Sequence, residues 1–302
     1  MLTPLPDTLL RPLVENALRE DLGRAGDITS NATIPANSQA KATFNARKAG
    51  IVAGIDLAHL AFQIFDPSVI FRPLKQDGDI LDAGDCIAEV HGPARSLLSA
   101  ERVSLNFLCH LSGIASETHK FVEAVKPHHA RICDTRKTTP GLRALEKHAV
   151  LAGGGHNHRF GLDDAVLIKD NHIAVAGGIR NAIKNVHKAI GHLVKVEIEV
   201  DTIEQLDEVL ALLPSMPVDV VMLDNMPPAT LKLAVEKVAR RLTVEASGGV
   251  TLQTVAAIAA TGVDVISCGW LTHSAPILDI GLDIEISGCS PDSQNKHDFF
   301  TS

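Results

Sequence analysis

Aromatic side chains are scarce in this sequence of 302 residues, since Phe, Trp and Tyr together make up 3% and Tyr is absent. Modules that bind single-stranded nucleic acid usually stack bases on aromatic rings, so the composition argues against a nucleic-acid partner. Hydrophobic residues still account for 45% of the chain, which is ample for a folded interior. The core must therefore be filled mainly by Leu, Ile, Val and Ala, which suits α/β packing.

Paired cysteines and long apolar runs are also missing. The five cysteines are scattered and form no Cys-x-x-Cys pair, which argues against a disulfide framework or a zinc cluster and favours a reducing compartment. No apolar run approaches the roughly 20 residues that a membrane-spanning helix needs, and the N-terminus does not have the pattern of a signal peptide. We therefore expect a cytoplasmic protein without a membrane partner.

Chain length and local patterns predict more than one domain. A chain of 302 residues exceeds the usual size of a single core. Residues 7–22 carry the apolar stripe of a helix, and residues 23–30 look like a loop. Short β-like runs follow between residues 41 and 90, interrupted by a helix at 57–64. Two further helical pieces, 97–111 and 115–125, are predicted to meet at Ser112-Gly113.

From residue 130 onward, strand patterns alternate with helical ones. The strand candidates are 130–135, 164–169, 193–200, 218–223, 242–247 and 263–267, and helices are expected at 202–213, 228–239 and 251–262. Such alternation predicts a parallel sheet that forms a barrel or part of one. The run 276–286 looks like a strand that returns to the first domain, and we expect the polar residues from 287 onward to be loose.

Charged or small polar residues stand at each of these six strand ends. They are Arg136 and Lys137, then Lys169, Glu199, Asp224 with Asn225, Ser247 to Gly249, and Ser267 with Gly269 and His273. In α/β barrels the chemistry lies at the C-terminal ends of the strands. A barrel without a function would not need this series, so we expect an active site on that face.

Positive charge gathers in residues 134–172, although the whole chain has a formal net charge of -8. Such a basic field favours a small anionic substrate, and a solvated loop with ordinary surface charge is the alternative. The glycine loops at 247–249 and 269 are suited to binding phosphate through backbone N–H groups. Tight turns that need positive φ would also explain these glycines. Thr251 is the expected cap of the helix that follows the first loop.

Other residues allow two interpretations each. Lys195, Glu197 and Glu199 alternate along one predicted strand and so share a face, where they could form a structural ion-pair network instead of a site. His156 and His158 have the spacing of strand metal ligands, but no acidic or thiol ligand stands at a recognisable distance, so a zinc site is not predicted. By periodicity alone, Arg102 is a surface residue paired with a helix neighbour.

Cationic groups, phosphate donors and two carboxylates together indicate a reaction class. Glu199 and Asp224 could hold sugar hydroxyls or Mg²⁺, or stabilise a cationic transition state. The set fits transfer of a phosphorylated sugar to an acidic acceptor. The P-loop, the GxGxxG fingerprint and the Gly-x-Ser-x-Gly elbow do not occur in the sequence.

The motifs themselves resemble a known family. DTRKTTPGLR, GGGHNHRFGLDD, LIKDNH, VEIEV, MLDN, EASGG and SCGWLTHS, in this order and spacing, are similar to those of the quinolinate phosphoribosyltransferase family, and GDITS and ERVSLNFL fit it too. The resemblance spans about residues 5–286. It implies an α/β protein with an N-terminal α+β sandwich in residues 1–112 and an incomplete, open α/β barrel in 113–274. A C-terminal segment, 275–302, would return to the first domain, and the chain would assemble as a homodimer or hexamer.

The resemblance also implies a reaction. Quinolinate and phosphoribosyl pyrophosphate, with Mg²⁺ and no bound organic cofactor, would give nicotinate mononucleotide, pyrophosphate and CO₂ in de novo NAD synthesis. A paralogous enzyme acting on another heterocyclic acid and a non-catalytic metabolite sensor are the alternatives. The several cations around Arg136 favour a dicarboxylate acceptor, and the intact Lys137, Glu199 and Asp224 argue against a sensor.

Residue roles follow from the same resemblance. The residues implied to bind quinolinate are Thr135, Arg136, His158, Arg159 and Lys169, together with Arg102 reaching across from the neighbouring subunit. The implied catalytic residues are Lys137, on the pyrophosphate side, and Glu199 and Asp224, which would hold the ribose hydroxyls and the metal. The phosphate would lie against Ser247, Gly248, Gly249 and Gly269, with His273 close by. Trp270 departs from the family pattern, because a smaller residue is expected there.

Overall fold

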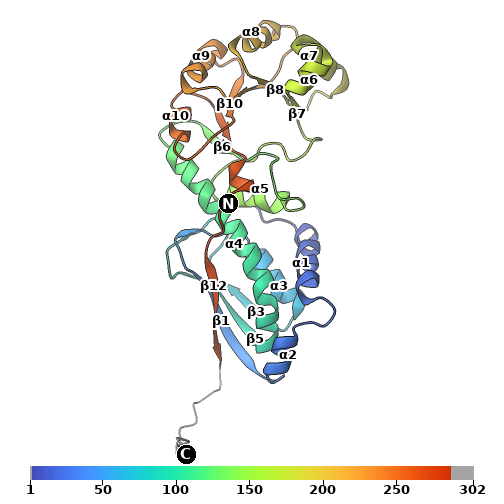
Figure 1. The fold of residues 1–302 in the computed structure, drawn as a ribbon, viewed down its shortest axis with the longest axis vertical. Helices are drawn as coiled ribbons and strands as arrows, with labels where there is room; N and C mark the ends of the chain where they lie inside the picture. Colours follow the sequence, from blue (N-terminus) through green and yellow to red (C-terminus); the bar gives the residue numbers. More distant parts are fainter. Residues whose placement is uncertain (1, 287–302) are drawn as a thin grey trace, which may run out of the picture.

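A computed structural model describes residues 2–286 of the chain. They form two units that lie one above the other in Figure 1, with the helix α4 (Ala94–Val125) running through both. The predicted boundary at residue 112 therefore falls inside a helix. No helix among these residues is long and apolar enough to cross a membrane. The polar residues from 287 onward, which we expected to be loose, lie outside the described part.

The prediction of two helical pieces that meet at Ser112-Gly113 is wrong, because α4 is one continuous helix of 32 residues. Glycine costs about 1 kcal/mol in a helix interior, but here a side chain would not fit. A Cβ on Gly113 would lie 2.1 Å from the carbonyl oxygen of Pro276. The neighbouring Ser112 is buried, and its hydroxyl accepts a hydrogen bond from the backbone N–H of Ala53 (3.0 Å). The apparent break is thus a contact point between the helix and two other segments.

The lower unit is an antiparallel sheet packed against helices. Its order is β12-β1-β5-β3, formed by β12 (Ile280–Ile286), β1 (Gln39–Ala46), β5 (Cys86–Pro93) and β3 (Ile70–Pro73). Alternate residues of β1 are buried, and they pack with α3 (Ile55–Phe65) and the first half of α4. A small pair, β2 (Gly50–Ile51) and β4 (Ile80–Leu81), and the helix α1 (Asp7–Leu22) complete the unit.

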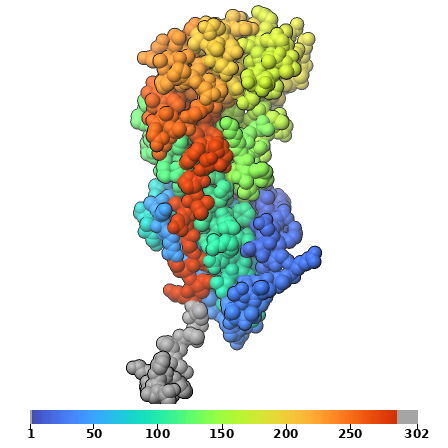
Figure 2. Space-filling model, in the orientation of Figure 1, coloured from blue at the N-terminus to red at the C-terminus, as the bar shows by residue number. Residues whose placement is uncertain are grey.

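Two predictions about this unit have clear outcomes. The run 276–286 does return to it, because β12 pairs with β1 from Ala40 opposite Ile286 to Ala46 opposite Ile280. Figure 2 shows this last segment, in red, extending from the upper unit over the lower one. The loop predicted at 23–30 is wrong at its end, because α2 (Ile28–Thr33) begins there. The side chain of Asp27 caps that helix by accepting a hydrogen bond from the N–H of Ser30 (2.8 Å).

The upper unit is a six-stranded parallel sheet in the order β6-β11-β10-β9-β8-β7. The strands are β6 (Arg131–Cys133), β7 (Val166–Ile168), β8 (Val196–Val200), β9 (Val220–Asp224), β10 (Thr243–Ser247) and β11 (Val265–Ser267). The helices between them are α5 (Arg143–Ala152), α6 (Asp170–Ala176), α7 (Ile179–Ala189), α8 (Ile203–Leu212), α9 (Pro228–Val238) and α10 (Val255–Ala259). In Figure 1, α7 to α10 lie on the outer side of the sheet.

The barrel is open at one place. Each strand pairs with its neighbour in parallel, but within residues 2–286 no ladder joins β6 to β7. The segment between them partly fills the gap, because His156 forms a parallel bridge with Cys133 of β6. The predicted incomplete barrel is confirmed. The predicted start of the helix at 251–262 is wrong, because Thr251 and Thr254 bond to each other in a turn and α10 begins only at Val255.

Candidate active site

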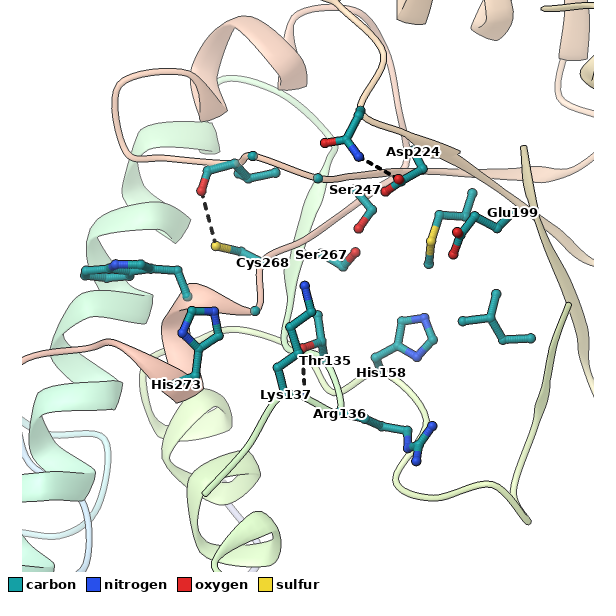
Figure 3. A pocket seen from close by; sticks show the side chains of 18 of the residues that line it. Thr135, Arg136, Lys137, His158, Glu199, Asp224, Ser247, Ser267, Cys268 and His273 are labelled. Carbon is teal, nitrogen blue, oxygen red and sulfur yellow. Dashed lines mark hydrogen bonds between the residues drawn. The ribbon is translucent and has the colours of Figure 1, made fainter. Parts of the chain in front are cut away.

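A cavity of about 730 Å³ opens at the carboxyl ends of the parallel strands (Figure 3). Thirteen of the fourteen residues to which the sequence assigns a binding or catalytic role line it: Thr135, Arg136, Lys137, His158, Arg159, Lys169, Glu199, Asp224, Ser247, Gly248, Gly249, Gly269 and His273. They come from all six strand ends and from the loop that crosses the gap between β6 and β7. Arg102 is the exception, because it lies exposed on α4 away from this cavity.

One wall of the cavity is strongly cationic and carries unused donors. Within the described residues, the Nε atoms of both Arg136 and Arg159 are buried without a hydrogen-bond partner. Only Nη1 of Arg159 is engaged, as a donor to the carbonyl of Ala165 (3.0 Å). Burial and the nearby charge of Arg136 lower the pKa of Arg159. Two guanidinium groups held this way would be stabilised by an anion with several oxygens.

Acidic groups line the cavity next to this wall. Nζ of Lys169 lies 2.9 Å from Oε2 of Glu199, a carboxylate that is 8% exposed. Carboxylate oxygens of Glu199, Asp201 and Asp224 lie within 4.8 Å of one another. Oxygen donors of this kind are the ligands that Mg²⁺ prefers, so the set fits that ion. Lys169 is therefore already paired with a member of this carboxylate group.

The two glycine loops also line the cavity, and both approach neighbouring side chains closely. Gly248 and Gly249 have φ of +91° and +58°, so the turn interpretation of these glycines is correct for their backbone. A Cβ on Gly248 would also lie 2.2 Å from Oδ1 of Asn225, which sits next to Asp224. Gly269 has an ordinary φ, but a Cβ there would lie 2.8 Å from Cδ of Lys137. Both loops are therefore built for close approach to their neighbours.

Comparison with known proteins identifies the architecture. A family model described as the quinolinate phosphoribosyl transferase N-terminal domain matches residues 27–112, and the model of its C-terminal domain matches residues 114–283. The chain belongs to the quinolinate phosphoribosyltransferase family. A curated relative from Bacillus subtilis, a probable nicotinate-nucleotide pyrophosphorylase (carboxylating), is 46% identical over 92% of this chain and 94% of its own length. The corresponding protein of Mycobacterium leprae is 44% identical over 91% of this chain and 96% of its own.

Solved structures agree with the family assignment. The crystal structure of NadC from Streptococcus pyogenes matches with a TM-score of 0.89 and 40% identity, covering 95% of this chain and all of that one. A human nicotinic acid phosphoribosyltransferase matches with a TM-score of 0.61 but only 14% identity, which shows the fold alone.

A buried acidic pair behind the quinolinate phosphoribosyltransferase cavity was not predicted as part of the site. Nε2 of His158 lies 3.1 Å from Oε2 of Glu197 and 3.5 Å from Oε1 of Glu245. Burial, and then the charge of Glu197, raise the pKa of Glu245 to about 7. The sequence signal was a glutamate within the apolar strand TVEAS. Lys195 does not join this group, because it pairs with Asp219 (2.5 Å) at the other end of the strands.

The protonation of His158 follows from its two ring nitrogens. The backbone N–H of Arg159 donates to Nδ1 (2.8 Å), so the ring proton of neutral His158 is on Nε2 and faces Glu197. Burial lowers the pKa of His158, while the bond to Glu197 and the charge of Glu245 raise it by more. A second ring proton would displace the Arg159 N–H, so we favour the neutral ring. With its proton on Nε2, the ring has no free nitrogen for a metal on that side.

Trp270, where the resemblance led us to expect a smaller residue, packs against the long helix. It begins α11 (Trp270–His273), lines the cavity and lies against Phe121 of α4, with ring centroids 6.2 Å apart. Part of the ring therefore belongs to the interface between the cavity loop and the long helix. His273, on the same short helix, has its Nδ1 2.6 Å from the hydroxyl of Ser274.

Proposed function

We propose that quinolinate binds at the cationic wall of the cavity and phosphoribosyl pyrophosphate along the carboxylates and the two glycine loops. The chain is a decarboxylating quinolinate phosphoribosyltransferase, which gives nicotinate mononucleotide, pyrophosphate and CO₂ in NAD biosynthesis. The observation that carries the arrangement is the pair of buried, unpartnered guanidinium Nε donors on Arg136 and Arg159, within residues 2–286.

The acceptor side has more cations than a monocarboxylate needs. Arg136 and Arg159 offer forked donors to the two carboxylates of quinolinate, and Thr135 and His158 line the same wall. Lys169 reaches the acceptor from the end of β7, on the other side of the opening in the barrel, where it also pairs with Glu199. This arrangement favours a dianion over an acid such as nicotinate, so the paralogue alternative is less well supported.

The ribose and phosphate side is assigned to the remaining residues. Glu199 and Asp224 hold the ribose hydroxyls and Mg²⁺, which when bound neutralises charge on the pyrophosphate. The same carboxylates stabilise positive charge on the sugar as the pyridine nitrogen attacks C1. Lys137 stabilises the departing pyrophosphate. Backbone N–H groups of the loops at Ser247–Gly249 and Gly269 cradle the 5′-phosphate, with His273 beside them.

Loss of CO₂ follows from the first step. Once the ring nitrogen is quaternised, its positive charge stabilises the carbanion that remains when the adjacent carboxylate leaves as CO₂. A proton then takes the place of the CO₂ on that carbon and gives nicotinate mononucleotide. Arg136 and Arg159 must therefore hold the retained carboxylate firmly without stabilising the departing one too strongly.

Arg102 acts on the acceptor of a neighbouring subunit in this proposal. It is exposed on α4 and does not line the cavity of its own chain. An assembly of two or six copies would allow it to complete the cationic wall across an interface. We also infer a cytoplasmic location, supported by Cys86, Cys109, Cys133 and Cys268, which are free thiols.

A single assay tests the function. The protein is incubated with quinolinate, phosphoribosyl pyrophosphate and Mg²⁺, and CO₂ and nicotinate mononucleotide are measured together. Equal amounts of both products are expected. Tight binding of quinolinate without any product would instead support a metabolite sensor. Turnover of nicotinate without release of CO₂ would support the paralogue.

A further inference from the structure

A buried ion pair lies directly behind the cationic wall and does not line the cavity. Asp134, at the end of β6, is fully buried, and Lys147 on α5 is 2% exposed. Nζ of Lys147 lies 2.5 Å from Oδ1 of Asp134. Asp134 directly precedes the loop with Thr135, Arg136 and Lys137. The ion pair is therefore attached to the loop that follows β6.

The remaining hydrogen bonds of this pair go to residues 156–158, the segment that leads to Arg159. Oδ1 of Asp134 also accepts from the backbone N–H of His158 (2.8 Å), and Lys147 donates to the carbonyl of His158 (3.0 Å). With the side-chain amide of Asn157 assigned in the orientation that satisfies both of its polar atoms, its nitrogen donates to Oδ2 of Asp134 (2.7 Å). The N–H of Asp134 donates to the carbonyl of His156 (3.1 Å). The ion pair thus clamps the backbone on both sides of His158.

The position of this segment explains why a clamp is needed. Residues 156–158 lie in the opening between β6 and β7, where the described residues form no ladder that would fix them from both sides. The single bridge from His156 to Cys133 holds only the start of the segment. Without the ion pair, the side chains of His158 and Arg159 would still bond to Glu197 and Ala165, but the backbone of His158 would lose its side-chain contacts to Asp134 and Lys147.

The energetics do not suggest a purely stabilising role. Burial raises the pKa of Asp134, and the bonds from Lys147 and the N–H of His158 offset this only in part. A carboxylate whose pKa is raised in the folded state costs stability at neutral pH. Buried ion pairs can often be replaced by uncharged groups without loss of stability, whereas removing one partner alone is costly. The described pair therefore calls for another explanation.

We propose that Asp134 and Lys147 are positioning residues that hold His158 and Arg159 opposite Arg136 in the geometry that binds the acceptor. The inference rests on the proposed function, in which these side chains bind quinolinate. Neither member of the pair touches the substrate. Its effect is on the distance between two loops that come from different parts of the chain.

The test replaces both charges at once. In the double variant Asp134→Asn with Lys147→Met, no charge is left unpaired, so the urea midpoint of unfolding should be at or above that of the unmodified protein. The dissociation constant of quinolinate, measured by calorimetry, should rise at least about tenfold, which corresponds to about 1.4 kcal/mol. The KM for phosphoribosyl pyrophosphate should change by less than about twofold. A merely structural pair would change stability and leave quinolinate binding intact.

The chain offers a control ion pair that makes the same kinds of bonds but is more exposed to solvent. Asp219 accepts from Lys195 (2.5 Å) and from the N–H of Val196 (2.8 Å) at the opposite ends of the strands, away from the cavity. The double variant Asp219→Asn with Lys195→Met should bind quinolinate as the unmodified protein does. If both double variants weaken quinolinate binding equally, the effect is general and the clamp is refuted.

Two single variants keep the outcome decisive. Asn157 is exposed, so Asn157→Ala should fold and should still weaken quinolinate binding by at least about threefold through the lost bond to Asp134. Unchanged binding in this variant overturns the proposal even if the double variant does not fold. Arg159→Ala tests the proposed function separately. If it binds quinolinate normally, the assigned role of Arg159 fails. If it binds weakly while the clamp variants bind normally, only the clamp fails.

Discussion

Replacing Glu245 with glutamine should change how the stability of the protein depends on pH. Glu245 is 3% exposed and lies beside Glu197 and His158. Burial and the charge of Glu197 raise the pKa of Glu245 from 4.5 to about 7 in the folded state. Between these two values the folded state binds more protons than the unfolded state, so stability falls as pH rises through that window. Above pH 7 this loss of folding stability is complete.

The size of the effect follows from the shift in pKa. A difference of this size corresponds to about 3 kcal/mol over the whole window, and to roughly 2–3 kcal/mol between pH 5 and pH 8. Glutamine at position 245 has the shape of a protonated carboxyl group and cannot ionise. When the pH is raised from 5 to 8, the free energy of unfolding of the variant should therefore increase by that amount relative to that of the unmodified protein.

Urea unfolding followed by circular dichroism at pH 5 and pH 8 gives the measurement. The relevant quantity is the stability of Glu245→Gln minus that of the unmodified protein, compared at the two pH values. Glu236, an exposed glutamate on α9, provides the control, and the same substitution there should give a difference that does not depend on pH. A pH-independent difference for Glu245→Gln as well would show that its carboxyl group is not destabilised by burial, and the reasoning would be refuted.

Three further predictions concern glycines and the subunit interface. Gly113→Ala should lower the free energy of unfolding by about 2 kcal/mol despite the better helix propensity of alanine, because the new Cβ would lie 2.1 Å from a backbone oxygen. The control Gly191→Ala, with open space around it, should have little effect, and thermal unfolding measures both variants. Gly269→Ala should push Lys137 aside and lower kcat/KM for phosphoribosyl pyrophosphate by about tenfold to a hundredfold with an unchanged unfolding midpoint; a normal rate would show that Lys137 does not depend on this contact. Arg102→Ala and Lys137→Ala should each be inactive, and mixing them should restore some activity in hybrid assemblies. Exchange of subunits without recovery would contradict a shared site.

Local periodicity is sufficient to predict most of the upper unit. The strands of the parallel sheet are short and mostly apolar, and each has a polar residue at or just after its end. Parallel strands bring these ends to one edge of the sheet. For that reason the sequence alone places residues as distant as Lys137 and Gly269 on one face, and both line the same cavity. The motif resemblance then assigns roles that periodicity cannot provide, as it does for Arg102.

Two features that the sequence did not reveal have the same physical cause, which is contact over long sequence distances. Ser112-Gly113 looks like a helix break, but the small side chains are required by segments around residues 53 and 276. Glu245 looks like an ordinary strand residue, and only the folded sheet brings it next to Glu197. The start of α2 is different, because its signal is local: Asp27 followed three residues later by Ser30 is a helix cap that could have been recognised.

The pairing of β12 with β1 has a consequence for how the chain folds during synthesis. Domains generally fold one after another from the N-terminus as they leave the ribosome. Here the sheet of the first unit receives one of its outer strands only after the whole parallel sheet has been translated. Until residues 280–286 emerge, β1 presents an unpaired edge, which is a surface prone to aggregation. The nascent chain is therefore expected to need protection at β1 until its last strand arrives.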